Sequence, residues 1–282
     1  MPRRDGKSDG SLFSSFCPAP PMCGRLPLAF PLPAPSAHPS PPALVLVGVG
    51  PGDPELLTVA AVREIAAADL VAFPVANDGG QGMAAGIAAR WLLPQQPQLP
   101  LLFPMTDAAE PRRQAWRTAA ATLAAAVAAG QRVVLLCEGD VSLYATSSYV
   151  LLALRRFHPD CPLRLIPGIS AVAAAAAAAG WPLALQRESL LIRPTPEQPA
   201  ELEALLERAA AEAMVLALLK LGRRWGWLRP LLERRRLLEQ SLFARRIGWP
   251  DQLVRPAIAV AAGEAPYFSL LLIRQGWPDL LP

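Results

Sequence analysis

One stretch near the start of the chain constrains the fold more than any other. Residues 45–58 read VLVGVGPGDPELLT, so an aliphatic run gives way to three glycines, two prolines and Asp53. A β-branched run that ends in alternating glycines is typical of a buried strand followed by a loop. Because an amphipathic stretch follows at 57–68, the pattern predicts a strand, a ligand-facing loop and a helix. Open α/β sheets place their small-molecule sites at such strand ends.

The glycine spacing excludes one common phosphate-binding loop and disfavours another. The loop at 48–53 has no Gly-Lys-Ser/Thr, so it is not a nucleoside-triphosphate P-loop. The spacing is G-x-G-x-G rather than G-x-G-x-x-G, and Pro51 would disturb a dinucleotide-binding turn, which disfavours a nicotinamide oxidoreductase. The plainer alternative is a strand-to-helix turn in which Asp53 only caps the helix.

The rest of the chain alternates between expected strands and helices. In the first half, strands are expected at 44–49, 70–73, 99–103, 132–137 and 163–166, and helices at 56–68, 81–92, 110–129, 143–157 and 169–179. In the second half, strands are expected at 189–193, 214–219, 241–245 and 266–274, and helices at 197–211 and 226–237. Strands separated by helices predict an α/β fold with a mostly parallel first sheet.

Composition shifts divide this pattern into three parts. Residues 1–42 are rich in Pro and Ser without periodicity, which predicts a disordered leader. We expect two α/β domains to follow, at 43–184 and 185–282, with a hinge at 180–183.

Charge, hydropathy and cysteine usage exclude several classes of function. The net charge is +4, of which the leader carries about half, so no concentrated basic patch indicates nucleic-acid binding. No apolar run reaches the ~18 residues that a membrane span needs. Four cysteines without a CxxC motif, and only two histidines, give no zinc or iron–sulfur pattern, so no metal is expected. The same cysteine usage favours a reducing, cytoplasmic compartment.

Three further stretches follow expected strands and carry polar groups. Residues 137–149 read CEGDVSLYATSSY, and their Gly-Asp pair places a carboxylate and free backbone groups at the sheet edge. Asp140 would serve equally well as a helix cap, and Ser170 of the PGISA stretch at 167–171 is open to both roles. In LLKLGR at 218–223, a lysine after an aliphatic run is often only the first solvated residue.

Together these stretches resemble the class III S-adenosylmethionine-dependent methyltransferases, the tetrapyrrole (corrin/porphyrin) methylase family. The family's GxGPGDPELLT motif is matched in full at 48–58, its Gly-Asp motif at 139–149 and its Pro-Gly-Ile-Ser motif at 167–170. The branch that methylates precorrin-2 at C-20 is similar at FPMT (103–106), LYATSSY (143–149), LKLGR (219–223) and YFSLL (267–271). Two departures stand out: Val141 replaces the usual proline after Gly-Asp, and residues 245–248 read RRIG where an acid–Arg pair often precedes the glycine.

The resemblance implies two α/β domains with a cofactor cleft between them. The expected activity is S-adenosyl-L-methionine-dependent methylation of precorrin-2, or cobalt-precorrin-2, at C-20 to give precorrin-3A in cobalamin biosynthesis. Cofactor contacts are implied for Pro51, Glu138, Gly139, Asp140, Leu143, Ser170, Ala171, Leu219, Gly248, Tyr267, Phe268 and Ser269. Substrate contacts are expected at Gly50, Gly52, Met105, Arg112, Arg113 and Arg223, the arginines orienting substrate carboxylates.

Candidate catalytic residues are few. Methyl transfer from a sulfonium mainly requires positioning and exclusion of water, which agrees with the lack of a conspicuous acid–base pair. Asp53 and Tyr144 are the candidates for polar steering near the reacting centre. The implied partners are a small-molecule tetrapyrrole and a second copy of the chain in a homodimer, with neither nucleic acid nor membrane.

Two alternatives to this reading stay open. The first lies within the superfamily: another corrin-ring methylase, or diphthine synthase acting on a protein. The second is a non-catalytic cofactor-binding protein, which Val141 and the altered 245–248 segment favour.

Overall fold

The computed structural model describes residues 41–77, 79–106 and 108–278. The predicted leader at 1–42 therefore lies almost entirely outside the described residues. None of the helices described is both long and apolar enough to cross a membrane.

The first sheet is entirely parallel. Its strands are β1 (Leu44–Gly48), β2 (Leu70–Val75), β3 (Gln98–Leu102), β4 (Val133–Cys137) and β5 (Leu163–Ile166), in the order β3-β2-β4-β1-β5. β1 and β4 are buried along their whole length. This fits a central parallel strand that is covered on both faces. The carboxyl ends of β4, β1 and β5 consequently lie side by side.

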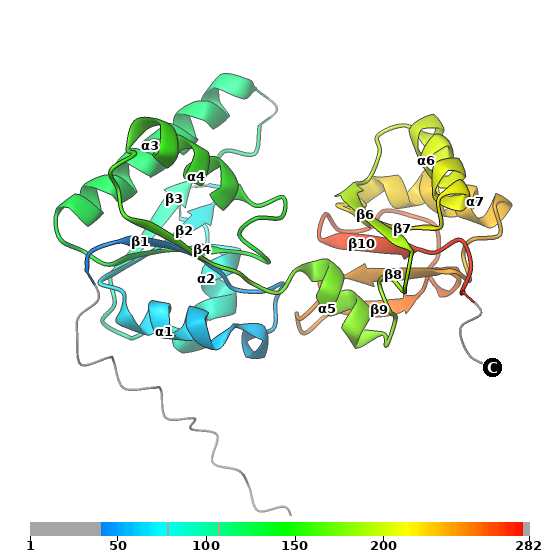
Figure 1. Cartoon of the computed structure of the whole chain (residues 1–282), viewed down its shortest axis with the longest axis horizontal. Helices are drawn as coiled ribbons and strands as arrows, with labels where there is room; N and C mark the ends of the chain where they lie inside the picture. Colours follow the sequence, from blue (N-terminus) through cyan, green and yellow to red (C-terminus); the bar gives the residue numbers. More distant parts are fainter. Residues whose placement is uncertain (1–40, 78, 107, 279–282) are drawn as a thin grey trace, which may run out of the picture. The chain divides into compact units, whose positions relative to one another are not determined.

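Helices cover both faces of this sheet (Figure 1). On one face lie α3 (Ala109–Ala128) and α4 (Thr146–Phe157), whose Leu123 and Val150 pack against Leu44 and Leu135. On the other face lie α1 (Val59–Ala67), α2 (Met83–Ala88) and the short 3-10 turn η2 (Ala89–Trp91). Another 3-10 turn, η1 (Pro54–Leu56), precedes α1. Successive residues of β1 alternate between these two cores, as strand geometry requires.

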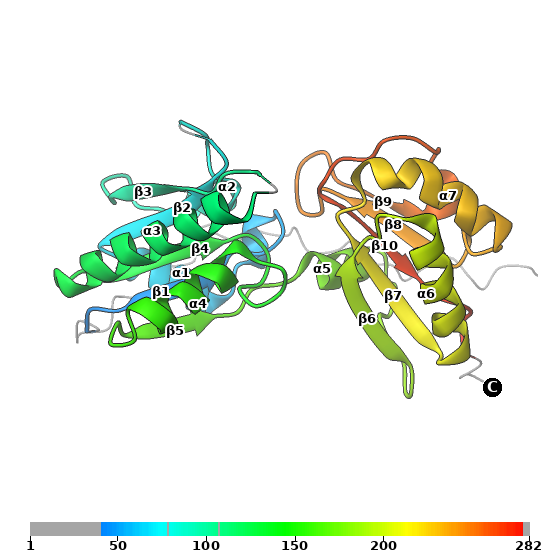
Figure 2. The ribbon, with the colours of Figure 1, turned by 90° about the horizontal axis from the view of Figure 1, so that it is seen from above.

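The second sheet is mixed. Its strands are β6 (Ser189–Pro194), β7 (Met214–Leu219), β8 (Ser241–Arg245), β9 (Leu253–Pro256) and β10 (Ser269–Ile273), in the order β6-β7-β10-β8-β9. Only β6 and β7 pair in parallel; the other neighbours are antiparallel. One face packs against α6 (Pro199–Ala211) and α7 (Trp225–Arg234), and the other against the alanine-rich α5 (Ala171–Ala178). Figure 2 shows these strands from above. Two further 3-10 turns are η3 (Gly222–Arg224) and η4 (Ala257–Ala259).

The α/β prediction is confirmed, and all nine expected strands are present. β9 was not predicted, and β10 begins three residues later than the expected 266–274 strand. Ser170 takes the helix-cap role that was open to it, since its hydroxyl accepts a hydrogen bond from Ala173 N–H at the start of α5. The helix expected at 56–68 begins at Val59 instead, and its cap is Thr58, whose hydroxyl accepts a hydrogen bond from Ala61 N–H. The domain boundary at residue 184 and the hinge at 180–183 stay predictions.

Candidate active site

Three glycines bring the ends of β1, β4 and β5 into contact. A Cβ added to Gly48 would lie 2.6 Å from Gly168 N and 2.8 Å from Gly139 O, and one added to Gly168 would overlap Gly139 O. The loops after β1 and β4 are also joined by hydrogen bonds, because Gly139 N–H donates to Gly50 O (2.8 Å) and Gly50 N–H donates to Gly139 O (3.2 Å). Only residues without a side chain allow this approach of three backbones.

The Asp140 carboxylate joins the β4 loop to the β5 loop. Its Oδ2 accepts a hydrogen bond from Gly168 N–H (2.9 Å), and its Oδ1 accepts one from Ser142 N–H (2.9 Å). Burial raises the pKa of Asp140. The hydrogen bonds from Ser142, Gly168 and Val141 lower that pKa by more than burial raises it, so the net pKa lies below its usual value. The carboxylate is therefore ionised and holds the loop in place.

A cleft of about 330 Å³ opens beside these strand ends and is lined by residues from both sheets. Eleven of the twelve predicted cofactor residues line it: Pro51, Glu138, Gly139, Asp140, Leu143, Ser170, Ala171, Leu219, Tyr267, Phe268 and Ser269. Tyr144 and Met105 line it as well, whereas Gly248 does not, although its neighbour Ile247 does. Residues far apart in the sequence are thus brought to one site.

The remaining predicted site residues lie away from the cleft lining: Asp53, Gly50, Gly52, Arg112, Arg113 and Arg223. Asp53 caps η1, since its Oδ1 accepts a hydrogen bond from Glu55 N–H (2.8 Å). Arg112 and Arg113 lie exposed in the first turns of α3, and Arg223 lies exposed in η3. Their roles toward a substrate stay predictions.

Gly52 and Gly248 allow two loops to pack against each other. A Cβ on Gly52 would lie 2.5 Å from Ile247 O, and one on Gly248 would overlap Asp53 N. The indole N–H of Trp249 donates to Pro51 O (3.0 Å), which fixes the loop after β1 to the loop after β8.

Glu138 is the carboxyl group of the cleft with the most perturbed pKa. Burial raises the pKa of Glu138 to about 7, and the charge of Arg246 partly opposes that rise. Arg246 is engaged elsewhere: its Nε donates to Asp251 Oδ1 (2.7 Å), and its guanidinium carbon lies 4.9 Å from the Trp249 ring centroid. The cleft therefore holds a carboxyl group that titrates near neutral pH.

Strained backbone is concentrated around the cleft. Six non-glycine residues of the described ranges have positive φ, and three of them line the cleft: Tyr144 (φ 52°), Lys220 (φ 59°) and Arg246 (φ 45°). Such conformations cost about 1–3 kcal/mol each and cluster at functional sites. The Tyr144 hydroxyl donates to Ile192 O of β6 (3.0 Å), which ties the β4 loop to the second sheet.

Sequence reasoning did not assign Lys220, Arg246 or Phe103 to the site, although all three line the cleft. Lys220 carried a signal, because it directly follows a buried strand at its carboxyl end. Arg246 carried the same signal, because it directly follows β8, and Phe103 lies in the FPMT stretch that resembles the family, but neither pattern gave the residue a role in the site.

The fold and the cleft define an α/β protein with a cleft of small-molecule size at the carboxyl ends of a parallel sheet. Within the described ranges, no group of His, Cys, Asp and Glu could hold a metal ion. Residues 43–259 match the sequence profile of the family described as Tetrapyrrole (Corrin/Porphyrin) Methylases. The chain belongs to this family of methyltransferases, as the motifs at 48–58, 139–149 and 167–170 predicted.

Two curated relatives match over almost their full lengths. The precorrin-2 C(20)-methyltransferase of a Sinorhizobium species is 34% identical over 247 residues, which cover 84% of this chain and 96% of the relative. The cobalt-precorrin-2 C(20)-methyltransferase of Salmonella typhimurium is 31% identical over 238 residues, 83% of this chain and 97% of the relative.

Solved structures share the fold. The methyltransferase CobJ superposes with a TM-score of 0.59 at 24% identity, covering 82% of this chain and 93% of CobJ. The uroporphyrin-III C-methyl transferase of Thermus thermophilus, solved in complex with S-adenyl homocysteine, superposes with a TM-score of 0.54 at 21% identity, covering 83% of this chain and 97% of that structure. The two-sheet architecture is therefore the fold of this family.

Proposed function

We propose that this chain is an S-adenosyl-L-methionine-dependent C-methyltransferase that methylates precorrin-2, or its cobalt-bearing form, at C-20 to give precorrin-3A in cobalamin biosynthesis. The observation that carries the proposal is the gathering of eleven of the twelve expected cofactor residues around one cleft. The substrate comes from the two curated relatives, which this chain matches over 96% and 97% of their lengths.

The residues of the cleft fit this cofactor. A cleft of about 330 Å³ lies in the size range of small-molecule sites. Leu143, Leu219, Tyr267 and Phe268 supply apolar and aromatic surface for an adenine ring, and the last two rings meet edge to face at 5.2 Å. Glu138 and Asp140 supply oxygens that accept hydrogen bonds from hydroxyl and amino groups.

The cofactor, when bound, supplies a methyl group that a sulfonium already activates. The chain has to hold the accepting carbon in line with that methyl group and keep water out. We assign Tyr144 to polar steering, because it lines the cleft and its hydroxyl is fixed on Ile192 O. The same role for Asp53 rests on the family motif alone, since its side chain caps η1.

Substrate binding is proposed at the rim of the cleft. Met105 lines the cleft with 79% of its surface exposed, which suits contact with a flat macrocycle. The guanidinium groups proposed to orient the substrate carboxylates are those of Arg112, Arg113 and Arg223. Gly50 and Gly52 would form the neighbouring wall.

We further propose a cytoplasmic homodimer. The thiols of Cys137 and Cys161 are free, which supports a reducing compartment. Tyr149, Leu152 and Phe157 of α4 expose 48%, 60% and 49% of their surfaces and offer apolar area for a second copy. Light scattering of the purified chain measures its mass in solution, and a monomer would contradict the dimer.

The experiment that tests the function is incubation of the full chain with S-adenosylmethionine and precorrin-2, with or without cobalt, followed by mass spectrometry. We expect a gain of one methyl group. Ala171→Leu, which would fill the cleft, should abolish the gain, whereas Ala173→Leu on the exposed side of the same helix should retain it. No mass gain on either substrate would overturn the proposal.

A further inference from the structure

Lys220 places a positive charge at the cleft that the protein does not neutralise. It lines the cleft directly after β7, and its Nζ lies 5.5 Å from the centroid of the Tyr267 ring. Arg246 is the other basic residue of the lining, and it is paired with Asp251. Among the residues that the structure describes, no carboxylate forms an ion pair with Lys220.

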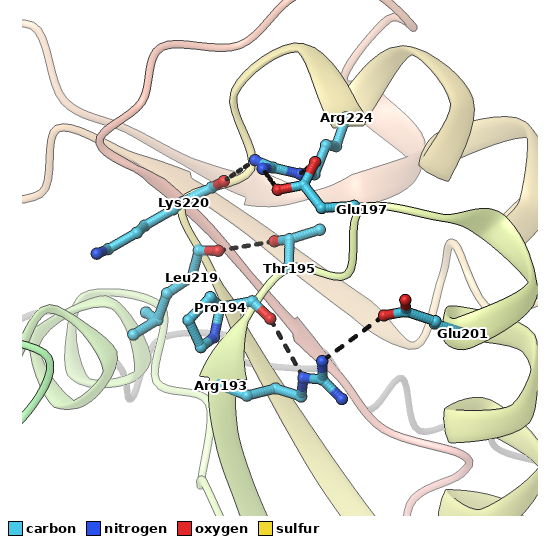
Figure 3. Close-up of polar contacts among 8 residues, drawn as sticks. All are labelled: Arg193, Pro194, Thr195, Glu197, Glu201, Leu219, Lys220 and Arg224. Atoms are coloured by element: carbon cyan, nitrogen blue, oxygen red, sulfur yellow. Dashed lines mark hydrogen bonds and ion pairs between the residues drawn. The ribbon is translucent and has the colours of Figure 1, made fainter. Parts of the chain in front are cut away.

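The backbone at Lys220 is held in an unfavourable conformation by hydrogen bonds on both sides. Its φ of 59° lies in the left-handed region, which residues other than glycine seldom adopt. Leu219 O accepts hydrogen bonds from both the N–H and the hydroxyl of Thr195, each at 2.7 Å. Lys220 O accepts one from a terminal guanidinium nitrogen of Arg224 (3.0 Å). Figure 3 shows these donors on the side of the turn opposite the Lys220 ammonium group.

The donors are themselves fixed. Thr195 is only 4% exposed, and Arg224 forms an ion pair with Glu197 through two contacts, of which Nε to Oε2 measures 3.0 Å. Leu221 N–H donates to Ser269 O (3.1 Å), so the turn is also joined to the start of β10. A strained residue persists only where its surroundings enforce the strain, and here three side chains do so. A lysine that was merely the first solvated residue of a strand would need no such network.

We propose that the Lys220 ammonium group binds a carboxylate of a ligand in the cleft, and that Thr195, Arg224 and Glu197 are positioning residues that aim it. The inference rests on the proposed function, which provides such carboxylates at two sources: the amino-acid end of the cofactor and the side chains of the tetrapyrrole. A charged hydrogen bond in a partly desolvated site gives both affinity and orientation.

The direct test compares Lys220→Met, which removes the charge, with Lys220→Arg, which keeps it. We expect Lys220→Met to weaken ligand binding about tenfold or more, as loss of a charge-assisted hydrogen bond predicts, and Lys220→Arg to restore most of it. Calorimetry measures the Kd of S-adenosylhomocysteine and of 5′-methylthioadenosine, which lacks the amino-acid end. Steady-state kinetics measures KM for the tetrapyrrole.

The two sources give different results. Weakened binding of S-adenosylhomocysteine with unchanged binding of 5′-methylthioadenosine assigns Lys220 to the cofactor carboxylate. A raised KM for the tetrapyrrole with unchanged cofactor binding assigns it to the substrate. If the wild type turns over and Lys220→Met leaves all three values unchanged, the inference falls while the proposed function stands.

The positioning role is tested by coupling. Arg224→Met, and the milder Glu197→Gln, should weaken the same ligand in the wild-type background and add nothing in the Lys220→Met background. Arg193→Met is the matched control, because Arg193 lies near the network but contacts Glu201 and Pro194 O rather than the turn (Figure 3). Equal effects of Arg224→Met in both backgrounds would show a merely structural role and overturn this part.

Discussion

Gly168 occupies the most crowded position of the candidate site, because its Cα faces both Gly48 and the carbonyl oxygen of Gly139. The side chains of the site keep their positions only if the backbones of Gly48, Gly139 and Gly168 stay in this close contact. The loop at 48–58 therefore serves close backbone packing as well as lining the candidate site. Its glycines admit neighbouring loops, and Asp53 organises the turn behind them.

Gly168→Ala tests this packing. The new Cβ would overlap Gly139 O, so we expect a loss of stability of about 1–3 kcal/mol and loss of S-adenosylhomocysteine binding. Urea unfolding and calorimetry measure the two effects. The matched control is Gly86→Ala in the exposed middle of α2, where a Cβ meets no atom within 4 Å. It should be neutral or stabilising by up to ~1 kcal/mol, and an equal loss in both variants would contradict the crowding argument.

Glu138 should make stability fall as pH rises. Its pKa is raised to about 7 by burial, with Arg246 partly opposing, so the folded chain holds this proton more tightly than the unfolded chain does. Stability from this group is full at pH values below the unfolded pKa and is lost as the pH rises toward 7. The free energy of unfolding should therefore fall by at most ~3 kcal/mol between pH 5 and pH 8.

Glu138→Gln isolates that contribution, because a glutamine side chain does not titrate. We expect the pH-dependent decline to be smaller in Glu138→Gln than in the wild type, as measured by urea unfolding at both pH values. Glu239→Gln, at an exposed position outside the cleft, should behave like the wild type. Parallel curves for Glu138→Gln and wild type would contradict the raised pKa.

At the scale of elements, the second sheet is tied together by a buried ion pair. Arg274 follows β10 and is 1% exposed, and it pairs with Glu188, which precedes β6 and is 12% exposed. The guanidinium carbon lies 5.1 Å from the Trp181 ring centroid and 4.4 Å from that of Trp277, and one of its nitrogens donates to Pro182 O (2.7 Å). This contact holds the proposed hinge segment against the end of β10.

Arg274→Met should leave the Glu188 carboxylate buried without its cation. We expect a loss of about 3–5 kcal/mol in the free energy of unfolding, read from urea denaturation. Arg208→Met, which breaks the exposed pair with Glu212, should cost less than ~1 kcal/mol. Adding Glu188→Gln to Arg274→Met should recover part of the loss, and no recovery would argue against the buried charge as its cause.

The sequence predicted most elements because their hydrophobic patterns are locally complete. β9 was not predicted because Leu253–Pro256 has only two aliphatic residues and ends in proline. It pairs only with β8, at the edge of the sheet. β10 starts at Ser269 rather than at 266 because Tyr267 and Phe268 belong to the loop that lines the cleft. Aromatic residues next to an aliphatic run have strand-like composition, so only tertiary contacts distinguish the two.

For the whole molecule, motifs predicted which residues meet but not how each one acts. Pro51, the 138–143 residues, Ser170 and Ala171 gather because their motifs follow strand ends that share one edge of the parallel sheet. Leu219 and residues 267–269 come from the second, mixed sheet, so their place at the same cleft was given only by the family resemblance. Lys220 was not assigned, although it follows a strand, since its orientation depends on Thr195, which is distant in sequence and bonds Leu219 O, and on Arg224, which bonds Lys220 O.

The central claim is that this cleft transfers a methyl group to C-20 of precorrin-2. It is tested most directly by supplying S-adenosylmethionine labelled with ¹³C in its methyl group and locating the label in the product by NMR. The account predicts a single labelled methyl group on C-20, absent from the product of Ala171→Leu. A label on any other carbon, or an unlabelled macrocycle, would contradict it.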